Sequence, residues 1–357
     1  MTSESSGKGQ MLRGFWYPVT LSAQVRKGKL RRAMLLGLPL AIGRDATGRP
    51  FAMRDACPHR GMPLTCGRVD GQLLECSYHG WRFDVHSGQC REIPSWVEGD
   101  RLKVDRIYAA HYPCEDQDGY IWVYIPQKEA VEEEAPPAPR LPVFSDNYRI
   151  TRLSADLPVH VDHGIIGLMD PAHGPFVHQS WWWRGRHSIR LKEKTFEPVP
   201  NGFRIRAHKP SSNSGAYKLL GVYGQPVTTT IEFVLPNMRF EQIHCGGKWF
   251  SSRATVTPIT MNLCRLDFCA AWNVFRYIPF VTPVFRIFAR TFIGQDTRTM
   301  ERQAEGLRHD PSLMLIDDAD RPAKWYYQLK QALIDSRLTG EPMKHPISEP
   351  VTLRWRS

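Results

Sequence analysis

The chain has 357 residues, of which 42% are hydrophobic, so it is too long for one small module and too apolar for a disordered chain. Its formal net charge of +11 favours an acidic partner, an anionic membrane or a nucleic acid without choosing among them. Eight cysteines without short, even spacing exclude a disulfide-stapled secreted domain and favour metal-binding or buried thiols.

The N-terminal sequence MTSESSGKGQ is polar, and no stretch of about 20 residues lacks both charge and proline. We therefore expect neither a signal peptide nor a membrane-spanning helix, and we expect a cytoplasmic protein. One segment, at 127–142, has the composition of a linker, because acidic residues and prolines replace the apolar alternation on either side. The expected parts are a disordered N-terminus at 1–11, a first domain at 12–126, the linker at 127–142, a second domain at 143–340 and a C-terminal tail at 341–357.

The first domain consists of short β-like runs such as MLLGLPLAIG and YIWVYI. Turn signals separate these runs, among them Asp70-Gly71 and Asp118-Gly119. This pattern predicts a small antiparallel β domain.

The second domain mixes helical and strand-like patterns. A broken helix is expected over 159–180, followed by strands between 192 and 272 and by two helices at 284–307 and 322–338. Hairpin signals within the strand region stand at Asn201-Gly202, Pro236-Asn237 and Gly246-Gly247. The sequence therefore predicts an α+β domain with an antiparallel sheet.

Two loops of the first domain each pair one cysteine with one histidine: CPHRG supplies Cys57 and His59, and CSYHGW supplies Cys76 and His79. A structural zinc site can also use two Cys and two His, but its usual knuckles pair like ligands, and the helix expected around the histidine pair is missing. Mixed loops fit a Rieske [2Fe–2S] cluster, with the two cysteines on one iron and the two histidines on the other. The alternative is four unrelated buried residues.

Residues 51–84 resemble the Rieske domain of Rieske non-haem iron oxygenases, over both loops and the spacer between them. Respiratory-type Rieske proteins have an extra cysteine just after each loop, whereas Met62 and Tyr78 stand near those places here. The resemblance implies a low-potential cluster. Cys66 and Cys90 remain as packing or exposed thiols.

A second group of candidate residues lies in DPAHGPFVH. Asp170 and His173 are three residues apart, so we expect them on one helical face, with Gly174-Pro175 breaking the helix and letting the rings of His173 and His178 converge. Two histidines and one carboxylate are the ligands of non-haem Fe(II) oxygenases. Taken in isolation, both histidines could instead be satisfied core residues, and the Rieske motif elsewhere in the chain favours the iron site.

The best candidate for the carboxylate is Asp296 in FIGQDTRTMERQ. Gln303 is seven residues later on the same helical face, where it could support the site. Asp296 could also be a surface aspartate, and Asp317 and Asp318 are weaker alternatives.

Both segments resemble Rieske oxygenase motifs, D-x2-H-x4-H and F-x3-D-x4-E-x-Q. The resemblance implies that His173, His178 and Asp296 bind a mononuclear Fe(II). It implies that Asp170 is an electron bridge, accepting hydrogen bonds from His173 and from His79 of a neighbouring subunit in a head-to-tail homotrimer. The family usually has Asn three residues before this aspartate, and here Gly167 stands there. Any role of that Asn is therefore absent or taken over by another residue.

Residues 12–335 resemble the oxygenase component of single-subunit-type Rieske monooxygenases, near the vanillate demethylase, pheophorbide a oxygenase and sterol-oxidising groups. The resemblance implies a C-terminal catalytic domain of the helix-grip, START-like kind. It implies a terminal oxygenase that uses O2 and electrons from a separate NAD(P)H-dependent reductase or ferredoxin to hydroxylate or demethylate a hydrophobic, ring-containing substrate. A monooxygenase is expected over a dioxygenase.

Several interpretations stay open at this point. Trp181, Trp182 and Trp183 could floor an apolar pocket or pack a subunit interface. The apolar run at 274–292 could line the core or make a peripheral membrane contact. The chain could instead be a Rieske electron-transfer protein with a non-catalytic second domain, or a zinc-bound regulator of nucleic acid. An acidic ferredoxin-like donor explains the positive charge better than a membrane does, and nucleic acid is not expected.

Overall fold

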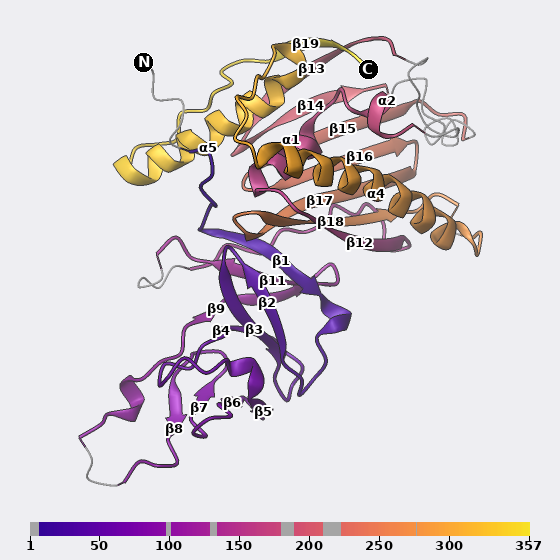
Figure 1. Ribbon diagram of the computed structural model, residues 1–357. Helices are drawn as coiled ribbons and strands as arrows, with labels where there is room; N and C mark the ends of the chain where they lie inside the picture. Colours follow the sequence, from indigo (N-terminus) through magenta and orange to yellow (C-terminus); the bar gives the residue numbers. More distant parts are fainter. Residues whose placement is uncertain (1–6, 98–100, 129–133, 180–188, 210–222, 276) are drawn as a thin grey trace. The chain divides into compact units, whose positions relative to one another are not determined.

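The computed structural model describes residues 7–97, 101–128, 134–179, 189–209, 223–275 and 277–357 (Figure 1). The chain forms two compact units. The N-terminal unit comprises Met11–Arg140 with Thr257–Thr260, and the C-terminal unit comprises Met1–Gln10, Leu141–Val256 and Met261–Ser357. None of the described helices is long and apolar enough to cross a membrane.

The N-terminal unit is built from three small antiparallel sheets, with strand orders β1-β11-β10, β2-β3-β4-β9 and β5-β6-β7-β8. Its strands are β1 (Phe15–Leu21), β2 (Arg31–Leu35), β3 (Leu38–Arg44), β4 (Pro50–Arg54), β5 (Arg68–Asp70), β6 (Leu73–Glu75), β7 (Arg82–Asp84), β8 (Cys90–Glu92), β9 (His111–Tyr112), β10 (Cys114–Gln117) and β11 (Tyr120–Ile125). The YIWVYI run forms β11, which is buried at every position because it is the central strand of its sheet. Asp118-Gly119 turns β10 into β11 with positive φ at both residues, as a tight hairpin requires.

The C-terminal unit contains one eight-stranded antiparallel sheet in the order β12-β18-β17-β16-β15-β14-β13-β19. Its elements are β12 (Arg149–Leu157), α1 (Val161–Met169), α2 (Gly174–Val177), β13 (Leu191–Val199), β14 (Gly202–His208), β15 (Val227–Val234), β16 (Met238–Cys245), β17 (Lys248–Thr260), β18 (Leu263–Trp272), α4 (Val281–Leu307), α5 (Arg321–Thr339) and β19 (Val351–Arg356). The three predicted hairpin signals each lie between consecutive strands, and both predicted C-terminal helices are present. The α+β prediction is confirmed.

Helix α4 lies across the strands of the large sheet (Figure 1). Its inner face is anchored by Phe285, whose ring centroid is 4.7 Å from that of Trp272 and 5.8 Å from that of Phe250. Aromatic contacts of this kind bury large apolar areas and fix the helix rotation. The rotation of α4 decides which of its residues face α1 and α2.

The expected C-terminal tail at 341–357 is wrong, because β19 pairs with β13 and forms the edge of the large sheet. Along VTLRWR, Leu353 and Trp355 are buried, whereas Thr352, Arg354 and Arg356 are exposed. This period of two is the pattern of a half-buried strand. The alternation of apolar and polar residues in VTLRWR is therefore the sequence signal that predicts β19.

A buried ion pair joins α1 to α5. The Lys330 ammonium, 1% exposed, donates to Oδ1 of Asp162 at 2.7 Å, and the Tyr326 hydroxyl donates to the same oxygen. The backbone N–H of Gly9 donates to Oδ2 at 2.9 Å. Gly9 lies in the segment 1–11 that was expected to be disordered, and this hydrogen bond ties it to α1.

We expect Lys330→Met to destabilise the C-terminal unit by about 3–5 kcal/mol, because it leaves the Asp162 carboxylate buried without its counter-charge. The matched control is Lys324→Met on the same helix, since Lys324 pairs with Asp317, whose side chain is 75% exposed. That loss should stay below about 1 kcal/mol. Urea unfolding at pH 7 measures both, and equal small losses would contradict the assignment.

Candidate functional site

The two Cys/His loops of the N-terminal unit have the same backbone geometry. The N–H of Gly61 donates to the carbonyl of Cys57 at 2.8 Å, and the N–H of Gly80 donates to the carbonyl of Cys76 at 3.0 Å. In both loops the cysteine N–H donates to the carbonyl of the residue after the glycine. Both glycines have φ near +70°, which only glycine adopts without strain. The two loops therefore make the same turn around their cysteines, whereas the histidine is two residues after the cysteine in the first loop and three in the second.

The side chains of these loops lie in like pairs, cysteine beside cysteine and histidine beside histidine. Cys57 and Cys76 are buried in the unit's core, and the ring centroids of His59 and His79 are 4.5 Å apart. The His59 ring also stacks on Trp81, with centroids 4.6 Å apart and planes 5° from parallel. The structure thus brings the two predicted cysteines together and the two predicted histidines together.

Two observations test whether these residues fit a metal cluster. Nδ1 of His59 is buried and has no hydrogen-bond partner among the described residues, which is costly for a neutral imidazole but suits a ligand atom. Burial raises the pKa of the Cys57 thiol to about 11, with the neighbouring Cys76 raising it further, although the N–H groups of His59 and Arg60 oppose the shift. A bound cation would offset that cost of forming a thiolate. The donor set fits a group held by two thiolates and two imidazoles.

In the C-terminal unit, His173, His178 and Asp296 form the second cluster, with one possible ligand atom from each within 4.8 Å of the others. Nε2 of His178 lies 3.1 Å from Nε2 of His173 and 3.2 Å from Oδ1 of Asp296, and the remaining distance is 3.9 Å. A metal about 2.1 Å from each ligand places neighbouring donors about 3 Å apart. The three side chains therefore fit one metal ion with open positions on its other side.

Asp170 lies on the far side of His173 from this cluster. Its Oδ2 is 3.5 Å from Nδ1 of His173, and its Oδ1 accepts the backbone N–H of Ala172 at 2.7 Å. The carboxylate of Asp170 lies next to Nδ1 of His173, so the other ring nitrogen, Nε2, points toward His178 and Asp296. Asp170 is thus placed to orient the ring.

Burial dominates the electrostatics of the second cluster. It raises the pKa of Asp296 to about 6, a shift that the charge of His173 partly opposes. Burial, together with the charge of His173, lowers the pKa of His178 to about 4. Burial alone would lower the pKa of His173, but the hydrogen bond and charge of Asp170 outweigh it and the pKa is raised. His178 is therefore neutral at pH 7 and offers a lone pair.

The prediction that Asp170 and His173 share a helical face is wrong. Helix α1 ends at Met169, Asp170 is its C-cap with extended backbone, and His173 is the N-cap of α2. The break thus precedes Gly174-Pro175, because proline is favoured in the first turn of a helix and starts α2 there. The turn between the helices, rather than a common face, brings the carboxylate to the ring.

The prediction that Gln303 supports the site is also wrong, since Gln303 is exposed. Gln295 takes this place, with its Oε1 3.0 Å from Nδ1 of His178. Phe292 stacks on the same ring, with centroids 3.5 Å apart and planes 16° from parallel. Both residues lie within one turn of Asp296, which is the signal that could have identified them.

The weaker carboxylate candidates lie elsewhere. Asp317 pairs with Lys324, and Asp318 accepts the backbone N–H of Arg354. Trp181, Trp182 and Trp183 lie outside the described residues. Cys66 is exposed and Cys90 is buried.

Gly167 has a packing explanation. A Cβ at this position would lie 2.8 Å from Cε of Met300 on α4. A larger residue such as Asn would therefore require the Met300 side chain to move. In this chain the Met300 side chain occupies the space that a side chain at position 167 would need.

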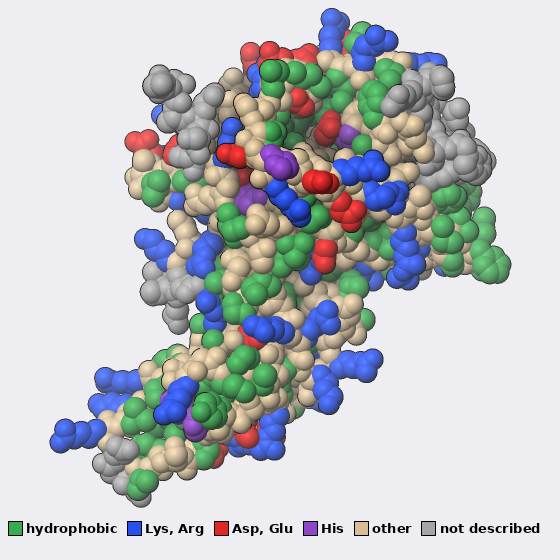
Figure 2. All heavy atoms as spheres, in the orientation of Figure 1, with side chains coloured by type: hydrophobic (Ala, Val, Ile, Leu, Met, Phe, Trp, Pro, Cys, Tyr) green, Lys and Arg blue, Asp and Glu red, His purple; other side chains and the backbone are tan. Residues whose placement is uncertain are grey.

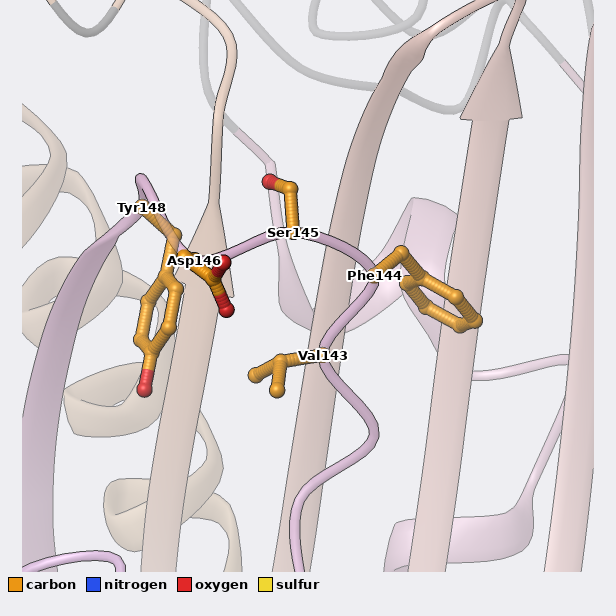
Figure 3. Close-up of a pocket in the computed structure, with 5 residues that line it drawn as sticks. All are labelled: Val143, Phe144, Ser145, Asp146 and Tyr148. Carbon is orange, nitrogen blue, oxygen red and sulfur yellow. The ribbon is translucent and has the colours of Figure 1, made fainter.

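A pocket of about 660 Å³ opens on the loop before β12, lined by Val143, Phe144, Ser145, Asp146 and Tyr148 (Figure 3). It contains one carboxylate and neither histidine nor cysteine. None of its lining residues belongs to either cluster.

We expect Gln295→Leu to lower the affinity for iron at the second cluster by about 10–100-fold, because Nδ1 of His178 loses the partner that fixes its tautomer. Iron retained after timed exposure to a chelator measures the effect. Gln303→Leu is the control, since this glutamine is exposed on the same helix. Identical iron loss in both variants would show that Gln295 does not act through His178.

Comparison with known proteins identifies relatives of both units. Residues 15–111 match the family model of the Rieske [2Fe-2S] domain. The chain is 32% identical to chlorophyllide a oxygenase of Chlamydomonas reinhardtii, covering 94% of this chain and 51% of the relative. It is 38% identical to 4beta-methylsterol monooxygenase of Methylococcus capsulatus, over 31% of this chain and 30% of the relative. A solved structure of dicamba monooxygenase bound to dicamba matches with a TM-score of 0.71 at 21% identity, covering 91% of this chain and 99% of that one.

These similarities differ in how much of each protein they cover. The chain spans about half the length of the chlorophyllide a oxygenase that it matches. The structural match shows that its fold is that of dicamba monooxygenase, which confirms the predicted fold class. The chain therefore contains a Rieske [2Fe–2S] domain, and over nearly its whole length it is homologous to part of chlorophyllide a oxygenase.

Proposed function

We propose that this chain is the terminal oxygenase of a Rieske-type system, which hydroxylates or oxidatively demethylates a hydrophobic, ring-containing substrate with O2. The observation that carries the proposal is the convergence of His173, His178 and Asp296 within 4.8 Å. A Rieske electron carrier has no use for a second metal site in another unit. When bound, a [2Fe–2S] cluster supplies one-electron transfer and a mononuclear iron supplies dioxygen activation.

We assign the cluster to Cys57, His59, Cys76 and His79. The positive φ of Gly61 and Gly80 and the matching hydrogen bonds of the two loops support this assignment. The chain keeps the two sulfurs buried and the ring of His79 at the surface beside the exposed Tyr78.

We assign the mononuclear iron to His173, His178 and Asp296. Asp170 orients His173 through Nδ1, and Gln295 orients His178 in the same manner. The stacking of Phe292 on His178 keeps water from one face of that ring. These residues would hold the three donor atoms of a bound iron in a fixed arrangement, and that iron would supply dioxygen activation.

We further propose that Asp170 is the link between the two centres, accepting a hydrogen bond from His79 of a neighbouring subunit in a homotrimer. The carboxylate of Asp170 is partly exposed, and one of its oxygens lies 3.5 Å from Nδ1 of His173. The electron donor is a separate reductase or ferredoxin, and the net charge of +11 suits an acidic one. We expect this oxygenase to work in the cytoplasm.

The substrate class rests on similarity. The named relatives are a chlorophyllide oxygenase and a methylsterol monooxygenase, and the solved structure holds dicamba. All three molecules contain rings. Sterols, tetrapyrroles and methoxy-aromatics are therefore the compounds to test, with monooxygenation expected over dihydroxylation.

The test is product analysis with purified, iron-loaded protein, a surrogate reductase, NADH and 18O-labelled O2. We expect one labelled oxygen from one of these substrate classes, in the product of a hydroxylation or in the formaldehyde released by a demethylation. The rival function is electron transfer with a non-catalytic second domain. It predicts about two irons per chain and no labelled product, and such a result would refute the oxygenase.

A further inference from the structure

The N-terminal end of α4 and the loop before it expose an unusual amount of apolar surface. Tyr277 is 81% exposed, Phe280 is 73% exposed and Ile287 is 62% exposed. The other exposed apolar residues of this segment are Ile278, Val284 and Phe288. The sequence leaves open whether the apolar run at 274–292 lines the core or contacts a membrane. In the structure, the residues of this run are divided between an inner face, which packs on the core, and an exposed outer face.

The inner face belongs to the core. Val281 and Phe285 pack against the buried cluster that contains Trp272. The outer face consists of Val284, Ile287 and Phe288, which follow the i, i+3, i+4 spacing of a helical stripe. The first two turns of α4 thus expose three large apolar side chains beside one charged residue, Arg286, whereas a helix on a protein surface normally has a mostly polar outer face.

Charge near this outer face is positive. Arg286 and Arg290 are exposed and one turn apart. The sequence between Asp267 and Asp296 contains neither Asp nor Glu. Figure 2 shows hydrophobic side chains gathered at this end of the C-terminal unit, with Lys and Arg side chains beside them.

The shape and charge of the segment favour a bilayer as its partner. The loop and the first turns of α4 extend past the ends of the neighbouring strands β12 and β18, so the apolar surface protrudes (Figure 1). A symmetric contact between two copies would bring together Arg286 and Arg290 of both, which repel one another. Apolar residues that can enter a bilayer, beside arginines that bind lipid phosphates, are typical of peripheral membrane contacts.

We propose that residues 277–290 dock this protein on anionic lipid bilayers. Tyr277, Phe280 and Ile287 enter the interface between headgroups and acyl chains, while Arg286 and Arg290 bind lipid phosphates. The contact is peripheral, and it does not depend on either metal centre. It goes beyond the oxygenase function and can be tested apart from it.

The experiment is co-sedimentation of the iron-loaded protein with vesicles of phosphatidylcholine alone or with about 30 mol% phosphatidylglycerol, in about 0.15 M salt. We expect binding to the anionic vesicles. The double variant Phe280→Ser/Ile287→Ser should lose at least about tenfold in affinity. Arg286→Glu/Arg290→Glu should lose binding to the anionic vesicles by a similar factor.

The matched control is Leu338→Ser, because Leu338 is 79% exposed on another helix and should bind like the unchanged protein. Iron content and melting temperature confirm that each variant is folded. The proposal is wrong if the unchanged protein does not sediment with anionic vesicles, or if Phe280→Ser/Ile287→Ser sediments equally well. It is also wrong if that variant changes only the oligomeric state, which would make the segment a subunit interface. Product formation from a water-soluble substrate, measured in parallel, tests the oxygenase separately.

Discussion

Replacement of His173 by alanine is expected to lower the iron content from about three to about two atoms per chain and to abolish product formation. The reason is geometric, because Nε2 of His173 is one of three donors within 4.8 Å and the two that remain cannot hold the metal firmly. The spectrum of the reduced Rieske cluster should not change, since Cys57, His59, Cys76 and His79 belong to the other unit. Iron analysis and EPR of the same sample measure both effects.

The control is His309→Ala, because His309 is exposed and takes no part in the cluster. It should retain about three irons and full activity. An His173→Ala variant that keeps its third iron and its activity would remove the basis of the proposed function.

Asp170→Asn is expected to keep both metals while turnover falls by about 10–100-fold. Asparagine has nearly the same shape, but it lacks the negative charge that raises the pKa of His173. The direct readout is the rate at which the pre-reduced Rieske cluster is reoxidised when O2 and substrate are added. This rate should fall, whereas reduction of the cluster by its donor should not.

Asp310→Asn serves as the control, because Asp310 is exposed after the end of α4. A reoxidation rate for Asp170→Asn equal to that of the unchanged protein would show that Asp170 does not link the centres. Loss of iron would instead show that its role is limited to orienting His173.

The Cys/His loops could be predicted from sequence because everything they need is local. Each loop places its cysteine, histidine and glycine within five residues, so spacing alone determines the backbone turn. Asp296 is more than a hundred residues from His178 in the chain. It could be identified only through its resemblance to a family motif, and the structure then placed it beside the two histidines.

Two details of the second cluster could not be read from residue spacing. Helical periodicity placed Asp170 and His173 on one face, but it does not say where a helix ends, and α1 ends between Met169 and Asp170. The choice between Gln295 and Gln303 depends on the rotation of α4, which Phe285 fixes by packing on Trp272. The end of α1 and the rotation of α4 thus depend on tertiary contacts that residue spacing does not reveal.

Helix α4 carries both the carboxylate of the second cluster and the apolar residues at its N-terminal end. Ile287 and Asp296 are nine residues apart, which corresponds to about 14 Å along the helix axis. A protein docked through that end would meet a lipophilic substrate within the plane of the bilayer rather than in bulk water. Its rate would then follow the mole fraction of substrate in the lipid, so that added phospholipid slows the reaction by surface dilution at constant total substrate.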